Sequence, residues 1–316
     1  MIGLIQNEWM KIFKRPGTYV MIAILLIATT VFGVVLKFEQ NDTNFEGTKN
    51  WEQNLKQENV ALQRQMEGSR SPLEKQDFKK RITINSYRIK HHIPPETSYH
   101  LWDFVNNAAE LIDVAGLFTI IISAGIVASE FTWGTIKLLL IRPITRIKIL
   151  LSKYITILLY AIFLLVILFA YSSAIGAILF GTADHSSIYL NYNNGIVSEQ
   201  SMFVHMLVYY GLNSINMIML ATMAFMISTV FRNSSLAVGL SIFLMFTGTQ
   251  LTELLSLKFS WAKYILFANT DLMPYFEGTP LIEGMTLSFS VVVLCAYFLL
   301  FHFLAFYVFN KRDVAA

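Results

Sequence analysis

Residues 111–154 read LIDVAGLFTIIISAGIVASEFTWGTIKLLLIRPITRIKILLSKY, and this stretch sets the class of the protein. Its first part, Leu111–Ala128, is an apolar run about as long as a helix that crosses a bilayer. The next segment, residues 129–153, carries six charged side chains, and all of them except Glu130 are basic. A second long apolar run starts at Tyr154. A basic loop between two such runs is typical of a membrane protein with several spans.

The composition of the whole chain points the same way. Of its 316 residues, 55% are hydrophobic and only 14% are charged, whereas soluble domains carry about 25% charged residues. A soluble protein this apolar would expose large apolar patches and aggregate. Cys295 is the single cysteine, which excludes a disulfide framework within the chain. The totals therefore favour a polytopic membrane protein.

Six apolar runs are close to the roughly 20 residues that a membrane-spanning helix needs. None has the alternating pattern of a barrel strand, so each is predicted to be a helix. The predicted fold class is therefore all-α, with a single transmembrane domain over residues 1–316. The predicted spans are residues 19–36, 111–128, 154–180, 203–231, 236–252 and 285–309.

Basic residues are distributed unevenly along the sequence. Residues 1–17, residues 129–153, the junction at Arg232 and the residues after 309 together hold eleven basic side chains and three acidic ones. Cytoplasmic loops of membrane proteins are enriched in Lys and Arg. We therefore expect a multi-pass protein of the cell (cytoplasmic) membrane with both termini in the cytoplasm. Residues 39–110, which link the first two spans, are then external.

The N-terminal residues 1–17 have the pattern of an amphipathic helix. Apolar side chains recur on one face, and Pro16-Gly17 follows as a corner into the first span. This predicts an elbow helix that lies in the cytoplasmic interface of the membrane. The alternative is a flank that only sets the topology.

Two further segments outside the spans have recognisable patterns. In residues 39–110, Trp51–Met66 reads as one helix, and the N-cap Ser71 with Pro72 opens a second. This predicts an external helical hairpin with too few apolar residues for a core of its own. Residues 256–284 are rich in aromatic side chains, which suits a short helix or re-entrant piece at the outer interface. An ordinary interfacial loop fits that segment equally well.

Motifs for several chemistries are absent from the sequence. The chain lacks G-x-x-x-x-G-K-[ST], H-E-x-x-H, G-x-S-x-G and any cysteine cluster. His91 and His92 are neighbours, and neighbouring helical residues point about 100° apart, so a solvated pair is expected rather than a metal site. We therefore expect no catalytic residue, no metal, no cofactor in this chain and no nucleic-acid partner. An integral-membrane lipid-modifying enzyme is a remote alternative, because it would need a polar cluster that the sequence does not show.

Polar side chains inside the predicted spans are candidates for lining a transport pathway. Asp113 is the one acid predicted within a span, near its outer end. Asn213 and Asn216 lie near the middle of the fourth span, and Thr249 and Gln250 lie in the fifth. The alternative role for such groups is hydrogen bonding between helices.

The basic loop has an apolar centre that topology does not explain. Glu130 ends the second span, and Gly134-Thr135 permits a turn. The run Ile136–Ile141 is then apolar except for Lys137, and Pro143 stops it. A short apolar helix bracketed by charge is typical of an element that docks into a groove of another protein. The alternative is a helix that lies back on the bilayer.

In this arrangement the chain resembles the permease subunits of ATP-binding-cassette exporters of the type-two (type V fold) class. In that family an elbow helix precedes six spans, and the loop between spans two and three forms a coupling helix in a cleft of the ATPase subunit. The likeness covers nearly the whole chain in topology, and its most specific part is the pattern of acid, Gly-Thr, apolar stretch, Pro and Arg in this loop. By this resemblance, the residues that would contact or shape the ATPase interface are Glu130, Gly134, Thr135, Leu139, Arg142, Pro143 and Arg146.

The resemblance implies an ATP-driven exporter in which a separate ATPase subunit binds ATP and Mg²⁺. This chain would pair with a second copy or with a related permease, and it would receive mechanical work through the loop. The long segment 39–110 departs from many family members. It leaves the substrate open between an antimicrobial peptide, a drug and a lipid-like compound, with multidrug or antibiotic resistance as the expected role. The alternative is a sensing or immunity component that binds an envelope-active peptide through residues 39–110.

Overall fold

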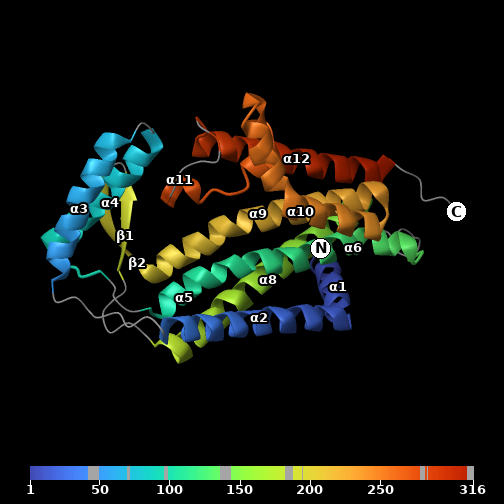
Figure 1. Ribbon diagram of the computed structural model, residues 1–316. Coiled ribbons are helices and arrows are strands. Elements are labelled where there is room, and N and C mark those ends of the chain that lie inside the picture. The colour runs from blue at the N-terminus through green and yellow to red at the C-terminus, as the bar shows by residue number, and fades with distance from the viewer. Residues whose placement is uncertain are drawn as a thin grey trace. The chain divides into compact units, whose positions relative to one another are not determined.

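The computed structural model of the chain describes residues 1–41, 50–69, 72–95, 99–135, 144–181, 188–193, 195–277, 282 and 284–311 (Figure 1). Within these residues, six helices are long and apolar enough to cross a membrane, which confirms a predominantly helical, polytopic membrane protein. They are Pro16–Glu39, Leu101–Thr132, Arg146–Phe180, Met202–Phe231, Ser234–Ser256 and Leu287–Lys311. The chain forms two compact units: residues 1–29, 108–171 and 210–316 make the first, and residues 30–107 and 172–209 make the second.

The core of the first unit is formed by α6 (Ile112–Thr132) and α9 (Met202–Phe231). Both helices are apolar on all sides, which is the pattern of a helix surrounded by other helices. α6 is buried along most of its length, and on α9 the run Met219–Phe225 is buried without interruption. Ala124 of α6 and Ala224 of α9 are fully buried in the same apolar cluster.

Hydrogen bonds hold these two central helices together. The Ser228 hydroxyl of α9 donates to the carbonyl of Ala124 at 2.6 Å and accepts the amide N–H of Ala128 at 3.1 Å. The Ser123 hydroxyl of α6 donates to the carbonyl of Ala221 at 2.6 Å. Helices in lipid associate through close packing and such bonds, because lipid tails are as apolar as the side chains. The small side chains of Ala124 and Ala128 thus lie at a close helix–helix contact.

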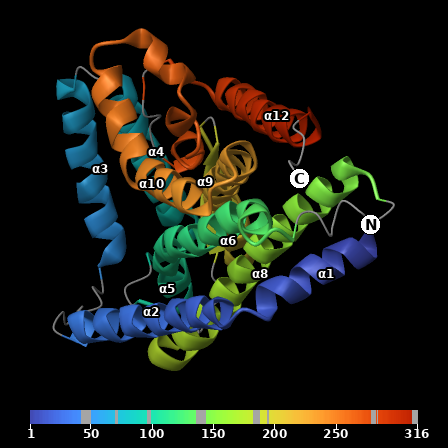
Figure 2. The same cartoon turned by 90° about the vertical axis from the view of Figure 1, so that its right-hand side faces the viewer.

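Two further helices of the first unit present apolar sides to the outside. α10 (Ser234–Ser256) packs against α6 (Figure 2), and α12 (Leu287–Lys311) ends the described chain. Phe246 on α10 and Leu299 and Phe303 on α12 are exposed. Exposed apolar sides on helices of span length are the sides that face lipid in a membrane protein.

The segment between α10 and α12 folds into short helical turns. They are η2 (Ser260–Tyr264), η3 (Leu266–Ala268) and α11 (Pro274–Glu277), and the first two pack against α10. The Phe267 ring lies so close to Gly248 of α10 that a Cβ there would be 2.5 Å from it. The Asn269 amide donates to the carbonyls of Lys263 (2.9 Å) and Ile265 (2.8 Å) and so closes the turns. Of the two structures that the sequence allows here, the short helical one is present.

A helical hairpin forms one part of the second unit. α3 (Trp51–Gly68) and α4 (Pro72–His91) run antiparallel, side by side (Figures 1 and 2). Leu55 and Leu62 of α3 are buried. Two polar pairs add to this small apolar contact. Arg81 Nη2 lies 2.8 Å from Glu58 Oε1, and Asn85 Nδ2 donates a hydrogen bond to Asn59 Oδ1 at 3.0 Å. Both helices lie where the sequence predicts them.

The second unit also contains a β-hairpin that the sequence did not predict. Strands β1 (Ile188–Asn193) and β2 (Ile196–Ser201) pair antiparallel, and α4 packs against both. Gly195 has a φ of 91°, a left-handed conformation that favours glycine in a tight hairpin turn. The fold is therefore helical with one two-stranded addition within the described residues.

Glycines let the short helix α5 (Leu101–Ala108) pack closely in the second unit. A Cβ at Gly33 of α2 (Pro16–Asn41) would lie 3.0 Å from the Phe104 ring of α5. A Cβ at Gly176 of α8 (Arg146–Phe180) would lie 3.1 Å from the same ring. The fully buried Phe104 ring therefore occupies space that a larger side chain at position 33 or 176 would fill.

Candidate functional site: an ion network at the base of the basic loop

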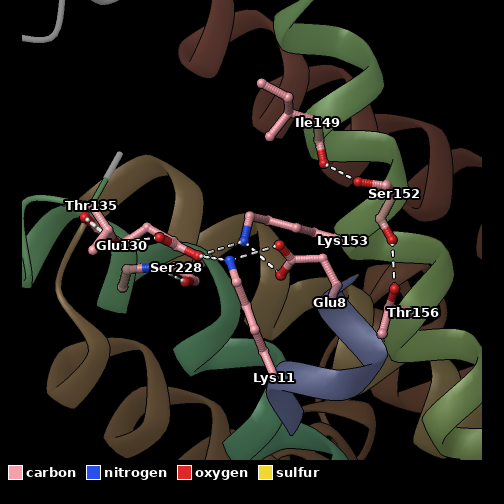
Figure 3. A network of polar contacts seen from close by, with 10 residues as sticks. Glu8, Lys11, Glu130, Thr135, Ile149, Ser152, Lys153, Thr156 and Ser228 are labelled. Carbon is pink, nitrogen blue, oxygen red and sulfur yellow. Dashed lines mark hydrogen bonds and ion pairs between the residues drawn. The ribbon is translucent and has the colours of Figure 1, made fainter. Parts of the chain in front are cut away.

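A network of four charged side chains joins three helices of the first unit (Figure 3). In the last turn of α6, Glu130 Oε1 lies 2.7 Å from Lys11 Nζ and 3.1 Å from Lys153 Nζ. Glu8 supplies a second carboxylate, with Oε1 3.0 Å from Lys11 Nζ and Oε2 2.8 Å from Lys153 Nζ. Two acids and two bases thereby link α1 (Ile2–Phe13), α6 and α8.

Burial makes this network different from a surface salt bridge. The exposed fraction is 1% for Lys153, 5% for Glu8 and 6% for Glu130, whereas Lys11 is half-buried. Buried charges are unfavourable unless they are paired. Removing one partner of a buried pair costs about 3–5 kcal/mol, because the other charge is left uncompensated. The local structure therefore depends on all four side chains.

α1 turns its charged pair toward the protein, while its apolar residues are divided between buried and exposed positions. Glu8 and Lys11 are three residues apart and so lie on one face of the helix. Ile12 is buried beside them, whereas Ile2 and Met10 are exposed. A charged pair on the protein-facing side departs from the usual pattern of a surface helix, in which that side is apolar.

Lys11 is cationic at neutral pH. Partial burial by itself lowers the pKa of Lys11, but its hydrogen bond to Glu130 and the charge of Glu8 outweigh this effect, so the pKa is raised above its usual value.

A void of about 10 Å³ beside the network is lined in part by Ile122 and Ile126. It has room for at most one water molecule.

The chain leaves α6 through a turn that is tied to the network. The Thr135 hydroxyl donates to Glu130 Oε2, and Gly134 between them has a φ of 69°, in the left-handed region that favours glycine. Trp133 is exposed, and the guanidinium carbon of Arg15 lies 5.3 Å from the centre of its ring. The start of the loop is therefore held by both α6 and the residues after α1.

The residues predicted for a partner interface have different outcomes. Glu130 is buried and paired at the base of the loop, and its predicted role at an ATPase interface stays a prediction. Arg146 donates from Nη1 to the carbonyl of Asn310 at 3.2 Å. The centre of the loop, residues 136–143 with Leu139, Arg142 and Pro143, lies outside the described residues.

The residues predicted to line a pathway are spread over three helices. Asp113 is exposed near the start of α6, Asn213 and Asn216 are half-buried on α9, and Thr249 and Gln250 are exposed on α10. Across the part of the chain that the structure describes, no three His, Cys, Asp or Glu side chains gather in a way that could hold a metal ion. Each of these five residues therefore remains a separate candidate for lining a pathway. The four members of the ion network, by contrast, are in direct contact with one another.

Sequence reasoning did not identify Glu8, Lys11 and Lys153 as members of one site. In the sequence these three residues were counted only among the charges that indicate the membrane topology. The available signal was that acids and bases occur together in segments predicted to lie on the same side of the membrane. Which of them meet depends on contacts between residues up to 145 positions apart, and periodicity carries no information on such contacts.

Comparison with known proteins gives one family and two relatives. A family described as "Protein of unknown function (DUF2705)" matches residues 75–315. The uncharacterized protein YhcI of Bacillus subtilis (strain 168) is 50% identical over 318 residues, which cover 100% of both chains. The uncharacterized membrane protein YdbK of the same organism is 34% identical over 198 residues, 62% of this chain and 76% of YdbK. The description of YdbK agrees with the six apolar helices found here.

Proposed function

The chain belongs to the family described as Protein of unknown function (DUF2705), and from that premise we propose that it is the transmembrane permease subunit of an ATP-driven exporter. ATP and Mg²⁺ are bound by a separate ATP-binding-cassette ATPase subunit, which docks on the basic loop between α6 and α8. The observation that carries the proposal is the ion network at the base of this loop. It fastens both ends of the loop to each other and to α1.

Such a fastening suits the transfer of mechanical work. Glu130 precedes the loop and Lys153 follows it, and their charged atoms are 3.1 Å apart. A partner that displaces the loop would therefore displace α6 and α8 together. α8 is a continuous helix of 35 residues, about 50 Å long at 1.5 Å per residue. Tilting its loop end moves its far end, and this movement opens an outward path in the proposed mechanism.

The first helix, α1, acts as the elbow in this proposal. Its exposed Ile2 and Met10 suit the boundary between lipid and water. Its buried Glu8 and the half-buried Lys11 hold it against the base of the loop. α1 therefore moves with the loop and keeps the moving end of the helices at the membrane surface.

The proposed assembly places the loop and both termini in the cytoplasm and residues 39–110 outside the cell membrane. The excess of basic residues in the loop and termini supports this orientation. Two permease chains, either two copies or this chain with a related permease, enclose the path, and two ATPase subunits bind beneath them. The substrate class stays open between an antimicrobial peptide, a drug and a lipid-like compound.

Co-purification with the ATPase tests the proposal. The tagged chain is purified from its native membrane, and any P-loop ATPase that accompanies it is identified by mass spectrometry. We expect Leu139→Asp with Arg142→Glu to abolish co-purification, because the pair replaces an apolar contact and a basic charge in the loop by acids. The matched control is Val60→Asp with Arg64→Glu on α3, where both side chains are exposed. An ATPase that is retained equally by both double variants, or that never accompanies the wild type, contradicts the proposal.

A sensing or immunity role is the second candidate, and the organised second unit favours it. The α3–α4 hairpin packs against a β-hairpin, so this part of the chain is more than a linker. In this role the segment 39–110 binds an envelope-active peptide. Deleting residues 51–89 would then abolish resistance while the chain still co-purifies with its ATPase. Loss of assembly in the same variant would instead assign the hairpin a structural role.

A further inference from the structure

The second unit contains a pocket that the proposed function does not use. Its volume is about 420 Å³, within the range of roughly 300–1,000 Å³ found for ligand sites. α5, the two strands and the start of α9 all contribute to its wall. The lining residues are Trp102, Ile188, Glu199–Ser201, Met202 and Phe203.

Part of the lining of the pocket is aromatic and apolar. The ring centres of Trp102 and Phe203 are 6.2 Å apart, and the two rings meet edge to face at 69°. Ile188 and Phe203 are exposed, so apolar surface remains in contact with solvent. A large apolar group that entered the pocket would remove this surface from water.

The lining of the pocket also includes a carboxylate. Glu199 is exposed on β2, and its Oε1 accepts a hydrogen bond from the Tyr87 hydroxyl of α4 at 3.2 Å. Partial loss of solvent and the nearby charge of Glu199 raise the pKa of Tyr87, so Tyr87 stays a donor at neutral pH. A carboxylate has acceptor positions beyond the one used by Tyr87. Among the described residues that line the pocket none is basic, so a carboxylate beside aromatic rings favours a cationic ligand.

The openness of the pocket favours a segment of peptide over a small molecule. Small ligands are usually 70–90% buried in their sites, and this pocket is largely open to its surroundings. A longer ligand can make further contacts on either side of it. β2 supplies three successive lining residues, and a strand that has one partner keeps backbone N–H and C=O groups along its outer edge. An extended peptide can pair with such an edge while its side chains enter a pocket.

We propose that the second unit binds an extended peptide segment in which a basic side chain stands next to a large apolar one. The apolar side chain packs against Trp102 and Phe203, and the basic group pairs with Glu199. This inference goes beyond the proposed function and does not depend on it, because binding is measured on the chain without any ATPase.

Isothermal titration calorimetry of the full chain in lipid nanodiscs tests the proposal. The probes are pentapeptides with blocked ends, Gly-Phe-Lys-Phe-Gly and its neutral counterpart Gly-Phe-Gln-Phe-Gly, together with the small amine phenethylamine. We expect the lysine peptide to bind about five-fold more tightly than the glutamine peptide, the upper range for a solvent-exposed ion pair. Phenethylamine should bind more weakly than either pentapeptide.

Two isosteric variants separate the pocket from general charge. Glu199→Gln should lower the affinity for the lysine peptide to that for the glutamine peptide and leave the latter unchanged. Glu67→Gln removes the same charge from an exposed position of α3 outside the pocket and should change neither affinity. Equal losses in both variants, equal binding of the two peptides, or no binding by the wild type would overturn the proposal. Phenethylamine that binds as tightly as the lysine peptide would also overturn it, in favour of a small amine.

Discussion

At the scale of single residues, Lys153 shows how much the first unit depends on charge pairing. Its side chain is 1% exposed, yet it carries an ammonium group. Lysine is almost never this buried unless it is paired, and here carboxylates of Glu8 and Glu130 lie 2.8 and 3.1 Å from Nζ. If Lys153 were neutral, Lys11 would be the only cation left to compensate two buried acids within the network.

We therefore predict that Lys153→Met destabilises the protein by about 3–5 kcal/mol, the cost of leaving a buried charge without its partner. Methionine keeps the length of the apolar stem and removes the ammonium group. The measurement is the free energy of unfolding, or the thermal midpoint, of the purified chain in nanodiscs. Lys148→Met is the matched control, because Lys148 is exposed on the same helix.

A second substitution tests whether the loss arises from charge. Adding Glu8→Gln to Lys153→Met leaves one acid and one base, Glu130 and Lys11, which lie 2.7 Å apart. Part of the lost stability should return. If the double variant is instead less stable than Lys153→Met, then the loss of stability arises from packing rather than from charge pairing.

Glu130 is a residue whose importance could be predicted from the sequence but whose interaction partners could not. The sequence singled it out, since an acid at the end of an apolar run beside a basic loop is unusual. Its chemical partners could not be deduced, because Lys11 and Lys153 are 119 and 23 residues away. In this structure Glu130 is buried and paired with both lysines, and its predicted role at an ATPase interface stays a prediction.

At the scale of elements, predictability follows the strength of the local signal. The six long helices were predicted because each contains about 20 apolar residues, and few other structures accommodate such runs. The second span proved longer than its apolar core, since α5 and a 3-10 turn precede α6 in Leu101–Thr132. The β-hairpin at residues 188–201 was missed because its strands are short and only partly apolar, although the Asn194-Gly195 pair is a hairpin signal.

The turns between α10 and α12 depend on one glycine. A Cβ at Gly248 would lie 2.5 Å from the Phe267 ring, and the ring is bounded by the turn that Asn269 closes. We predict that Gly248→Ala destabilises the protein by about 1–3 kcal/mol through overpacking. Gly239→Ala on the same helix is the control, because nothing lies within 4 Å of a Cβ there. It should be neutral or slightly stabilising, since alanine favours a helix over glycine.

The same measurement distinguishes a steric effect from a change in the helix itself. Phe267→Ala in the Gly248→Ala background removes the ring that the new methyl group meets. The two substitutions should therefore cost less together than the sum of their separate costs. Additive losses would mean that Gly248 does not act through Phe267.

At the scale of the whole molecule, one consequence of the six helices is a fixed alternation of sides. In the proposed topology all six helices cross the membrane, so both termini and the loop between α6 and α8 would lie on one side. The segment predicted to be external, residues 39–110, would then be on the opposite side. The proposed ATPase contact requires the loop to be cytoplasmic, so orientation is a condition of the proposed function as well as a property of the fold.

The single cysteine makes this orientation directly measurable. In a Cys295→Ser background, cysteines are introduced one at a time as Glu67→Cys on α3 and Lys148→Cys on α8, both at exposed positions. With a maleimide that cannot cross membranes, we expect Glu67→Cys to be labelled in intact cells and Lys148→Cys only after the membrane is permeabilised. The excess of basic side chains beside Lys148 predicts this result. Labelling of Lys148→Cys in intact cells would place the basic loop outside, where no ATP is available, and would rule out the proposed docking of an ATPase whatever the outcome of co-purification.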